Sequence, residues 1–168
     1  IGGRVTPFIP NRFTDGYGLH KETLRKLQQD NGSSLVITAD CGISAIDEIA
    51  YANSLGQDVI IVDHHSPPAN LPAAHATVNP KVNPDKSVFR DFSAGALAYK
   101  LGQALIERSD QKADPLRWLD LATLSTIADL VPIRGENRWL VRDGLEAIRH
   151  TTRPGLRALL NVAGLWDT

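Results

Sequence analysis

The sequence contains no methionine, and Cys41 is its only cysteine. A single cysteine excludes a disulfide within the chain and fits a reducing compartment, so we expect a cytoplasmic protein. The lack of methionine leaves no initiator residue, and the chain opens at Ile1 on a strand-like run. We therefore expect this chain to be an internal piece of a longer protein.

Long apolar runs are absent as well. No stretch approaches the roughly 18 apolar residues that a membrane-spanning helix needs. The residues after Ile1 lack the charged, apolar and small-residue layout of a signal peptide. Hydrophobic residues make up 42% and charged residues 22% of the 168 residues, which is ordinary for one globular domain. We expect no membrane partner.

The chain also lacks an excess of positive charge. Its 18 basic and 19 acidic side chains give a net charge of −1, whereas strong nucleic-acid binders concentrate Lys and Arg. The exception is the stretch 134–157, in which Arg134, Arg138 and Arg142 recur every fourth residue. Such a row repels itself on a helix unless neighbouring acids or phosphates compensate it. This end could therefore contact a nucleic acid, but weakly if it acts alone.

Short apolar runs alternate with amphipathic stretches through the first part of the chain. Their apolar content predicts strands buried on both faces, and such strands separated by helices are typical of a parallel sheet with right-handed crossovers. From Ser93 onward helical periodicity dominates, and Pro154 is placed to begin the last helix. The predicted fold class is α/β, a parallel sheet with helices on both faces followed by a helical carboxyl-terminal half. The predicted strands are Arg4–Pro10, Leu35–Ala39, Val59–Val62 and Val78–Val82, and the first helices are His20–Asp30 and Ile43–Ala50.

Ionisable side chains follow the predicted strands directly. Asp40 comes after LVITA, Asp63, His64 and His65 come after VIIV, and Asp129 ends a helical stretch. Ligands gather at the carboxyl ends of parallel strands, so these groups could converge at one point. Each also has a plainer interpretation, because an aspartate at a strand end is more often a cap or turn residue. A histidine pair is more often structural than metal-binding.

Carboxylates and imidazoles together suit a hard or borderline divalent ion such as manganese. Carboxylates gathered without a cation would raise one another's pKa, and a cation removes that conflict. A bound ion could polarise a phosphoryl oxygen and lower the pKa of a bound water. The spacing alone thus favours a metal site without requiring one.

The motifs and their order resemble those of the DHH phosphoesterase superfamily. VDHH at Val62–His65 is similar to the motif that names the superfamily, and ITADCGIS at Ile37–Ser44 resembles the motif that precedes it. The segment Ser125–Leu145 looks like the fourth motif. PNRFTDGYGL at 10–19, FSAGALAYKL at 92–101 and RPGLRALL at 153–160 resemble, more narrowly, the RecJ family of single-strand-specific exonucleases. The likeness covers nearly the whole chain.

The resemblance implies roles for individual residues. Asp40, His64 and Asp129 match metal ligands of the family, which binds manganese or magnesium, with two ions expected in the intact protein. His65 and Asp63 match positions of the family that take part in catalysis. His65 would face the substrate phosphate, and Asp63 would orient an imidazole.

The resemblance also implies a division of the chain. Residues 1–130 would form the DHH core without its first strand and first metal motif, which we expect upstream of Ile1. Residues 131–168 would form a helical extension toward a further carboxyl-terminal domain.

Four residues are candidates for substrate binding. Arg12 and Tyr17 lie in the RecJ-like segment, where a guanidinium could hold a phosphate and an aromatic ring could stack on a base. The alternative is a surface arginine beside a packed tyrosine. Ser93 and Gly95 open a helix whose backbone N–H groups could bind an anion, although a plain N-cap has the same sequence.

The activity implied by the resemblance is hydrolysis of phosphodiester bonds in single-stranded DNA, from the five-prime end, in DNA repair and recombination. The expected partners are single-stranded DNA and either a single-strand-binding protein or a helicase. Two alternatives stay open: a DHH-type oligoribonuclease or nucleotide phosphatase, and a non-catalytic RecJ-like scaffold. We expect the present chain alone to be inactive, because it lacks the first metal motif.

Overall fold

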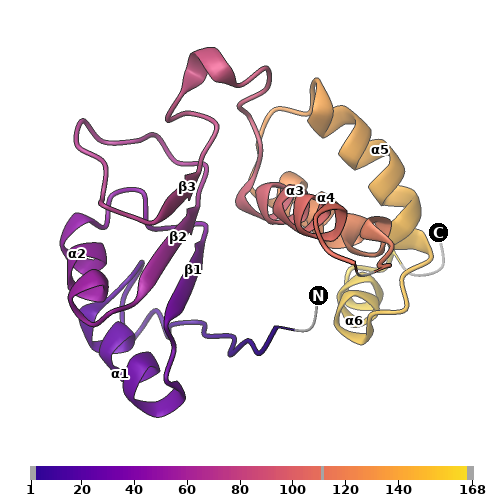
Figure 1. Cartoon of the computed structure of the whole chain (residues 1–168). Helices are drawn as coiled ribbons and strands as arrows, with labels where there is room; N and C mark the ends of the chain where they lie inside the picture. Colours follow the sequence, from indigo (N-terminus) through magenta and orange to yellow (C-terminus); the bar gives the residue numbers. More distant parts are fainter. Residues whose placement is uncertain (1–2, 111, 166–168) are drawn as a thin grey trace.

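Three parallel strands form the sheet of the amino-terminal half (Figure 1). In this computed structural model, which describes residues 3–110 and 112–165, they are β1 (Leu35–Ala39), β2 (Asp58–Val62) and β3 (Ala76–Val78), in that order across the sheet. Ala39 pairs with Val62, and Val62 pairs with Val78. All three strands therefore end at one edge, and the residue that follows each strand is delivered to that edge.

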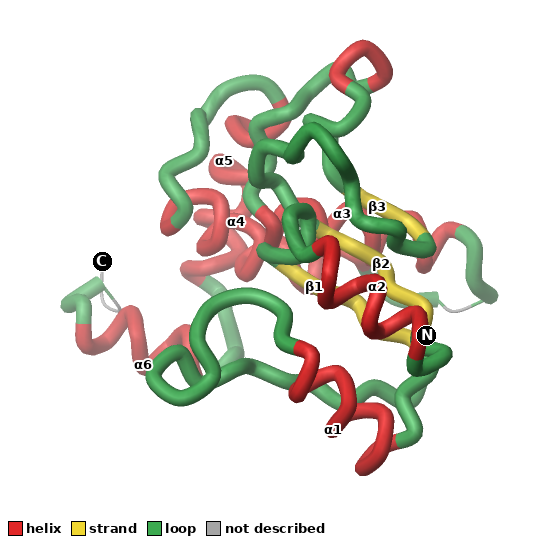
Figure 2. Tube along the Cα trace, turned by 90° about the vertical axis from the view of Figure 1, so that its left-hand side faces the viewer, coloured by secondary structure: helices red, strands yellow, loops and turns green. Residues whose placement is uncertain are grey.

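Helices cover both faces of this sheet (Figures 1 and 2). On one face lie α1 (Lys21–Asn31) and α2 (Ile46–Ser54), and on the other lies α3 (Ala94–Glu107). Successive side chains of a strand point to opposite faces. Val59 and Ile61 of β2 accordingly belong to the core beneath α1 and α2, whereas Ile60 and Val62 belong to the core beneath α3.

The carboxyl-terminal half is helical, and the predicted α/β class is confirmed. α4 (Leu119–Ala128) packs against both α3 and α5 (Glu136–Arg149). Gly144 permits the close approach of α5 to α4, because a Cβ at this position would overlap the side chain of Thr123. In the described part of the chain, no helix has the length and apolar character needed to cross a bilayer. The helices of this half are α4 (Leu119–Ala128), α5 (Glu136–Arg149) and α6 (Pro154–Val162), with 3₁₀ turns η1 (Pro84–Lys86) and η2 (Pro115–Trp118) before them.

The strand predicted at Arg4–Pro10 does not form. This segment has no regular structure, and the side chains of Val5 and Ile9 are 81% and 90% exposed. Pro7 and Pro10 have no backbone N–H to donate to a neighbouring strand, which removes part of the ladder that pairing would require. The prediction of a first strand here was wrong.

The other strand predictions need smaller corrections. β3 ends at Val78, where the strand predicted over Val78–Val82 was to begin. The side chain of Asn79 accepts the backbone N–H of Lys81 and turns the chain away. The bounds of β1 are as predicted, but it is an edge strand of the described sheet, and Ile37 is 54% exposed rather than buried.

Candidate metal centre

Asp40 leaves the end of β1 in a left-handed backbone conformation, with φ of 65°. Its N–H donates to the carbonyl of Val62 over 3.0 Å, so the β1–β2 ladder continues through this residue. Gly42 two residues later has φ of 109°, and a Cβ there would lie 2.7 Å from Oγ1 of Thr38. The tight turn therefore requires glycine at position 42 and leaves the Asp40 carboxylate 62% exposed at the sheet edge.

Asp63, directly after β2, is the structural centre of the site. Its side chain is 1% exposed, and its oxygens accept the N–H groups of Ile43, His64 and His65. The ring Nδ1 of His65 lies 2.7 Å from Oδ1 of Asp63. Burial alone would raise the pKa of Asp63, but the hydrogen bonds from the His65 ring and from these backbone groups outweigh burial and lower it.

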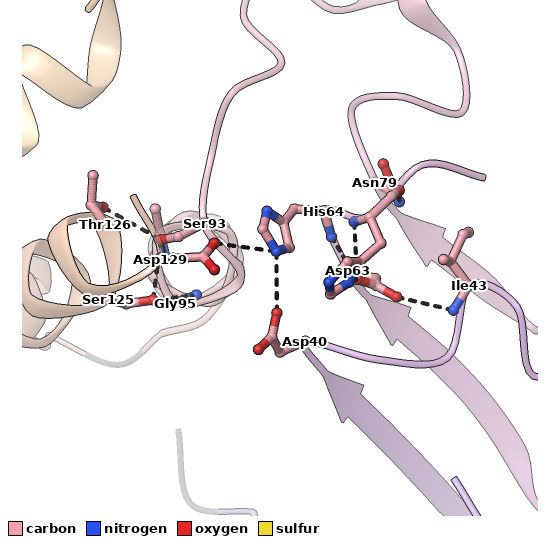
Figure 3. Close-up of polar contacts among 12 residues, drawn as sticks. Asp40, Ile43, Asp63, His64, Asn79, Ser93, Gly95, Ser125, Thr126 and Asp129 are labelled. Atoms are coloured by element: carbon pink, nitrogen blue, oxygen red, sulfur yellow. Dashed lines mark hydrogen bonds and ion pairs between the residues drawn. The ribbon is translucent and has the colours of Figure 1, made fainter. Parts of the chain in front are cut away.

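The imidazole of His64 meets two carboxylates from different parts of the fold (Figure 3). Its Nε2 lies 3.3 Å from Oδ1 of Asp40 and 3.2 Å from Oδ2 of Asp129. This nitrogen is buried, yet no described residue makes a hydrogen bond of acceptable geometry with it. Asp40 comes from the sheet half and Asp129 from the end of α4 in the helical half, so the two halves meet at this ring.

His65 lies beside this cluster and is more open to solvent. Its side chain is 59% exposed, and its ring centroid lies 4.6 Å from that of His64. The amide of Asn79 donates to the carbonyl of His65 over 2.9 Å. Because Asp63 engages Nδ1 of His65, Nε2 is the other ring nitrogen that could meet a ligand.

Donor atoms suited to a divalent cation gather here. One ligand atom each from Asp40, His64 and His65 lies within 4.8 Å of the others, and Asp129 touches the same His64 nitrogen. Burial, followed by the charges of Asp63 and Asp40, raises the pKa of the Cys41 thiol, which disfavours a thiolate ligand. The His64 nitrogen, which has no hydrogen-bond partner among the described residues, and the mixed carboxylate and imidazole set fit manganese or magnesium.

The residues proposed to open an anion site on α3 are engaged within the protein. Ser93 is fully buried, and its Oγ accepts the N–H of Ala96 as an ordinary N-cap. The N–H of Gly95 donates to Oγ of Ser125, which also lies 3.1 Å from Oγ of Ser93 (Figure 3). These contacts favour the N-cap interpretation, and a substrate role for Ser93 and Gly95 stays a prediction. Their position is nonetheless informative, since they pack α3 against the end of α4 that carries Asp129.

Arg12 and Tyr17 lie together on the irregular segment before α1. The Arg12 guanidinium carbon is 4.6 Å from the centroid of the Tyr17 ring, and Tyr17 is 77% exposed. Tyr17 lines the same cleft of about 670 Å³ as His20, Asp40 and Cys41. An exposed aromatic ring thus borders the same hollow as one candidate ligand.

Arg134, Arg138 and Arg142, which recur every fourth residue in α5 and the turn before it, differ in their partners. Arg134 donates to the Asp91 carboxylate, and Arg142 donates to its neighbour Asp143. Arg138 is exposed and has no ion-pair partner among the described residues. Compensation by the neighbouring acids Glu136 and Asp143, as expected from the sequence, therefore holds only for Arg142 and Asp143. Arg134 pairs instead with the distant Asp91, and Glu136 pairs with Lys100.

Asn79 is the site residue that sequence reasoning missed. It is 8% exposed and joins the carbonyl of His65 to the N–H of Lys81. Asn79 directly follows β3, just as Asp40 and Asp63 directly follow β1 and β2, and this position could have identified it. The misplaced third strand concealed that position.

The chain is similar in sequence to proteins of one known family. A model of the DHH family, N-terminal domain, matches residues 1–128, and the chain belongs to the DHH family. Within that family it is of the RecJ type. It is 41% identical over 164 residues to the single-stranded-DNA-specific exonuclease RecJ of Bacillus subtilis, and 38% identical over 166 residues to that of Escherichia coli.

Solved structures agree with this assignment. A crystal structure of exonuclease RecJ bound to manganese superimposes with a TM-score of 0.84 at 36% identity, covering 95% of this chain and 40% of that one. The RecJ of Thermus thermophilus in complex with Mn²⁺ gives 0.72 at 36% identity, covering 84% of this chain and 21% of that one. The alignments cover 98% and 92% of this chain but only 20% and 29% of the Bacillus and Escherichia relatives.

Proposed function

We propose that this chain is the central part of a metal-dependent exonuclease that degrades single-stranded DNA from its five-prime end in repair and recombination. The observation that carries the proposal is the meeting of Asp40 and Asp129 at Nε2 of His64, with His65 beside it. A cluster of this composition suits an ion that acts on phosphate. The RecJ relatives supply the substrate, because their names specify single-stranded DNA.

In the proposed mechanism, Asp40, His64 and Asp129 hold manganese or magnesium. The ion, when bound, supplies Lewis-acid activation of the phosphoryl group and of the attacking water. Asp63 keeps the proton of His65 on Nδ1, which leaves Nε2 to contact a phosphate oxygen or exchange a proton with it. Tyr17 stacks on a base along the adjoining cleft, and Arg12 contacts the backbone.

The chain alone is proposed to be inactive. The described donor atoms suit one ion, whereas in-line displacement at a phosphodiester commonly uses two ions that stabilise both attacking and leaving oxygens. The ligands for a second ion would come from the upstream motif that the DHH resemblance implies. We further propose a cytoplasmic location, the domain division at residue 130, and a protein partner that presents single strands, either a single-strand-binding protein or a helicase.

Manganese titration by calorimetry tests the site. We expect the chain to bind Mn²⁺ and the double variant Asp40→Ala, His64→Ala to lose that binding. The matched control is Asp58→Ala, His75→Ala, because this exposed pair joins the same residue types at 3.5 Å near the other end of the sheet. Loss of binding in both double variants, or in neither, would contradict the proposed site.

Cleavage assays test the substrate. The chain extended upstream, supplied with manganese, should release the label of five-prime-labelled single strands as a mononucleotide, shorten three-prime-labelled single strands progressively, and leave dinucleotides and duplex ends intact. Preferential cleavage of dinucleotides would instead favour an oligoribonuclease or nucleotide phosphatase. No cleavage of either, with manganese binding intact, would favour a scaffold.

A further inference from the structure

Asn137 is a fully buried amide in the first turn of α5. Its Nδ2 donates to the carbonyl of Pro132 over 3.0 Å and to the carbonyl of Asp91 over 2.6 Å. Its Oδ1 is also buried and has no hydrogen-bond partner among the described residues. Reversing the amide would place this oxygen against two carbonyl oxygens, so the assignment of the nitrogen is fixed by its surroundings.

A buried acceptor without a partner is unfavourable, and an apolar side chain of similar size would avoid that cost. Packing therefore gives no reason for asparagine at this position. The two N–H groups of the amide give a reason for asparagine. They tie together the segments around Asp91 and Pro132, and neither residue belongs to a helix or a strand.

The segments that Asn137 joins flank the candidate metal centre. Pro132 lies in the turn that follows Asp129, and Asp91 lies two residues before Ser93, which caps α3. This turn is strained, since Leu130 has φ of 55° and an 88% exposed side chain that packing does not hold. The Arg134–Asp91 ion pair spans the same two segments, but the Arg134 side chain is 74% exposed and contributes little.

We propose that Asn137 is a positioning residue that fixes the turn after Asp129, and thereby holds the Asp129 carboxylate against His64. The proposal rests on the proposed function in so far as this contact is part of a metal centre. Asn137 touches neither the candidate ligands nor a substrate in this scheme. It acts through the backbone of residues 129–132. Asn137 anchors the Pro132 end of this segment, and Asp129 lies at the other end.

The chain offers a matched control for the test. Gln57 is 1% exposed and its Nε2 also donates to two backbone carbonyls, those of Leu24 and Ser33, while its Oε1 has no partner among the described residues. It precedes β2, at the opposite end of that strand from Asp63. Asn137→Leu and Gln57→Leu therefore remove the same kind of buried tether, near the candidate centre and far from it.

Two measurements on both variants and the unaltered chain decide the proposal, after circular dichroism has verified that each variant folds. The first is amide hydrogen exchange together with the NMR signals of the His64 ring, neither of which needs a metal. In Asn137→Leu we expect faster exchange over residues 129–134 and a displaced His64 signal, with both unchanged in Gln57→Leu. The second is Mn²⁺ affinity, which we expect to fall about tenfold in Asn137→Leu and to change less than about twofold in Gln57→Leu.

Each outcome has a defined meaning. Unchanged exchange and an unmoved His64 signal in Asn137→Leu would overturn the proposal. So would equal losses of manganese affinity in the two variants, since these would indicate a structural role alone. If the unaltered chain does not bind Mn²⁺, the metal site of the proposed function fails in this chain. The exchange and His64 signals then still decide whether Asn137 positions Asp129.

Discussion

The Asp63 carboxylate, buried at the end of β2, holds the exposed ring of His65 through a 2.7 Å contact between Oδ1 and Nδ1. The same carboxylate accepts three backbone N–H groups, so it fixes the loop and the ring together. An asparagine in place of Asp63 cannot do this, because it has one acceptor oxygen and turns an NH₂ group toward donors.

We expect Asp63→Asn to destabilise the chain by about 2–3 kcal/mol, since it removes charge-assisted hydrogen bonds in a buried place. Urea denaturation followed by circular dichroism measures this. The control is Asp58→Asn on the same strand, where a 66% exposed side chain should give less than about 0.5 kcal/mol. Similar losses in the two variants would contradict the role given to Asp63.

The lowered pKa of Asp63 predicts a pH dependence. A carboxyl group whose pKa is lower in the folded than in the unfolded state stabilises the fold above its ordinary value of 3.8. That stability is lost as the pH falls through the folded-state pKa. The free energy of unfolding should therefore fall more steeply below about pH 4 for the unaltered chain than for Asp63→Asn, and parallel curves would refute this.

Gly144 should be intolerant of any side chain. We expect Gly144→Ala to cost about 1–3 kcal/mol, because the new methyl group would overlap Thr123 and lie 3.1 Å from the carbonyl oxygen of Leu119. The control is Gly102→Ala in α3, where nothing lies within 4 Å and alanine should stabilise the helix by up to about 1 kcal/mol. We expect the melting temperature to fall in Gly144→Ala and to rise in Gly102→Ala.

Arg153 should matter more than its partial exposure suggests. It donates to the 8% exposed carboxylate of Asp120 over 2.9 Å, and also to the carbonyl of Arg117. Arg153→Ala leaves that buried carboxylate without its cation and with only the Thr151 hydroxyl and the Leu121 N–H as partners among the described residues, and we expect a loss of about 3 kcal/mol. Arg149→Ala breaks an exposed pair with Glu146 and should cost less than about 0.5 kcal/mol. Equal losses of unfolding free energy for the two variants in denaturant titrations would contradict the larger contribution given to the Arg153–Asp120 contact.

Tyr17 should contribute to single-strand binding without contributing to stability. Its ring is 77% exposed, and stacking on a base is worth about 1–3 kcal/mol. We expect Tyr17→Ala to weaken binding of a labelled oligothymidylate about tenfold in fluorescence anisotropy at low salt, with an unchanged melting temperature. Tyr17→Phe retains the ring and should bind like the unaltered chain. Weak binding by the phenylalanine variant would mean that the hydroxyl, not the ring, makes the contact.

Much of the sheet could be predicted because the apolar runs of β1 and β2 are bounded by polar residues. Their bounds agree with prediction to within one residue, and the parallel register brings Asp40 and Asp63 to one edge as expected. The 3.2 Å approach of Asp129 to His64 was harder to predict, because it depends on how α4 packs against α3. Its place at the end of a helical stretch made Asp129 a candidate, and the likeness of Ser125–Leu145 to the fourth DHH motif indicated its role as a ligand.

Two other features show where the sequence reasoning was limited. Ser93 and Gly95 have the pattern of an anion-binding helix start, but the pattern cannot reveal that Ser125 occupies the Gly95 N–H. Arg4–Pro10 has the apolar content of a strand, although its prolines remove donors that a strand requires. In the first case the deciding partner is distant in the sequence. In the second the prolines were visible in the sequence, but the apolar content was given more weight than the donors they remove.

The place of His64 between the two halves has a consequence for the order in which the molecule assembles and opens. Its contact with Asp129 closes a long loop of chain, so we expect it to form after the sheet and the α3–α4 pair have each folded, whereas its contact with Asp40 lies within the sheet half. A local opening that separates the halves would remove the Asp129 contact and would also part Ile60 and Val62 of β2 from the core beneath α3, while the core beneath α1 and α2 stays intact. Ion release should therefore accompany this partial unfolding, and the retention time of a bound ion would report how often the two halves part.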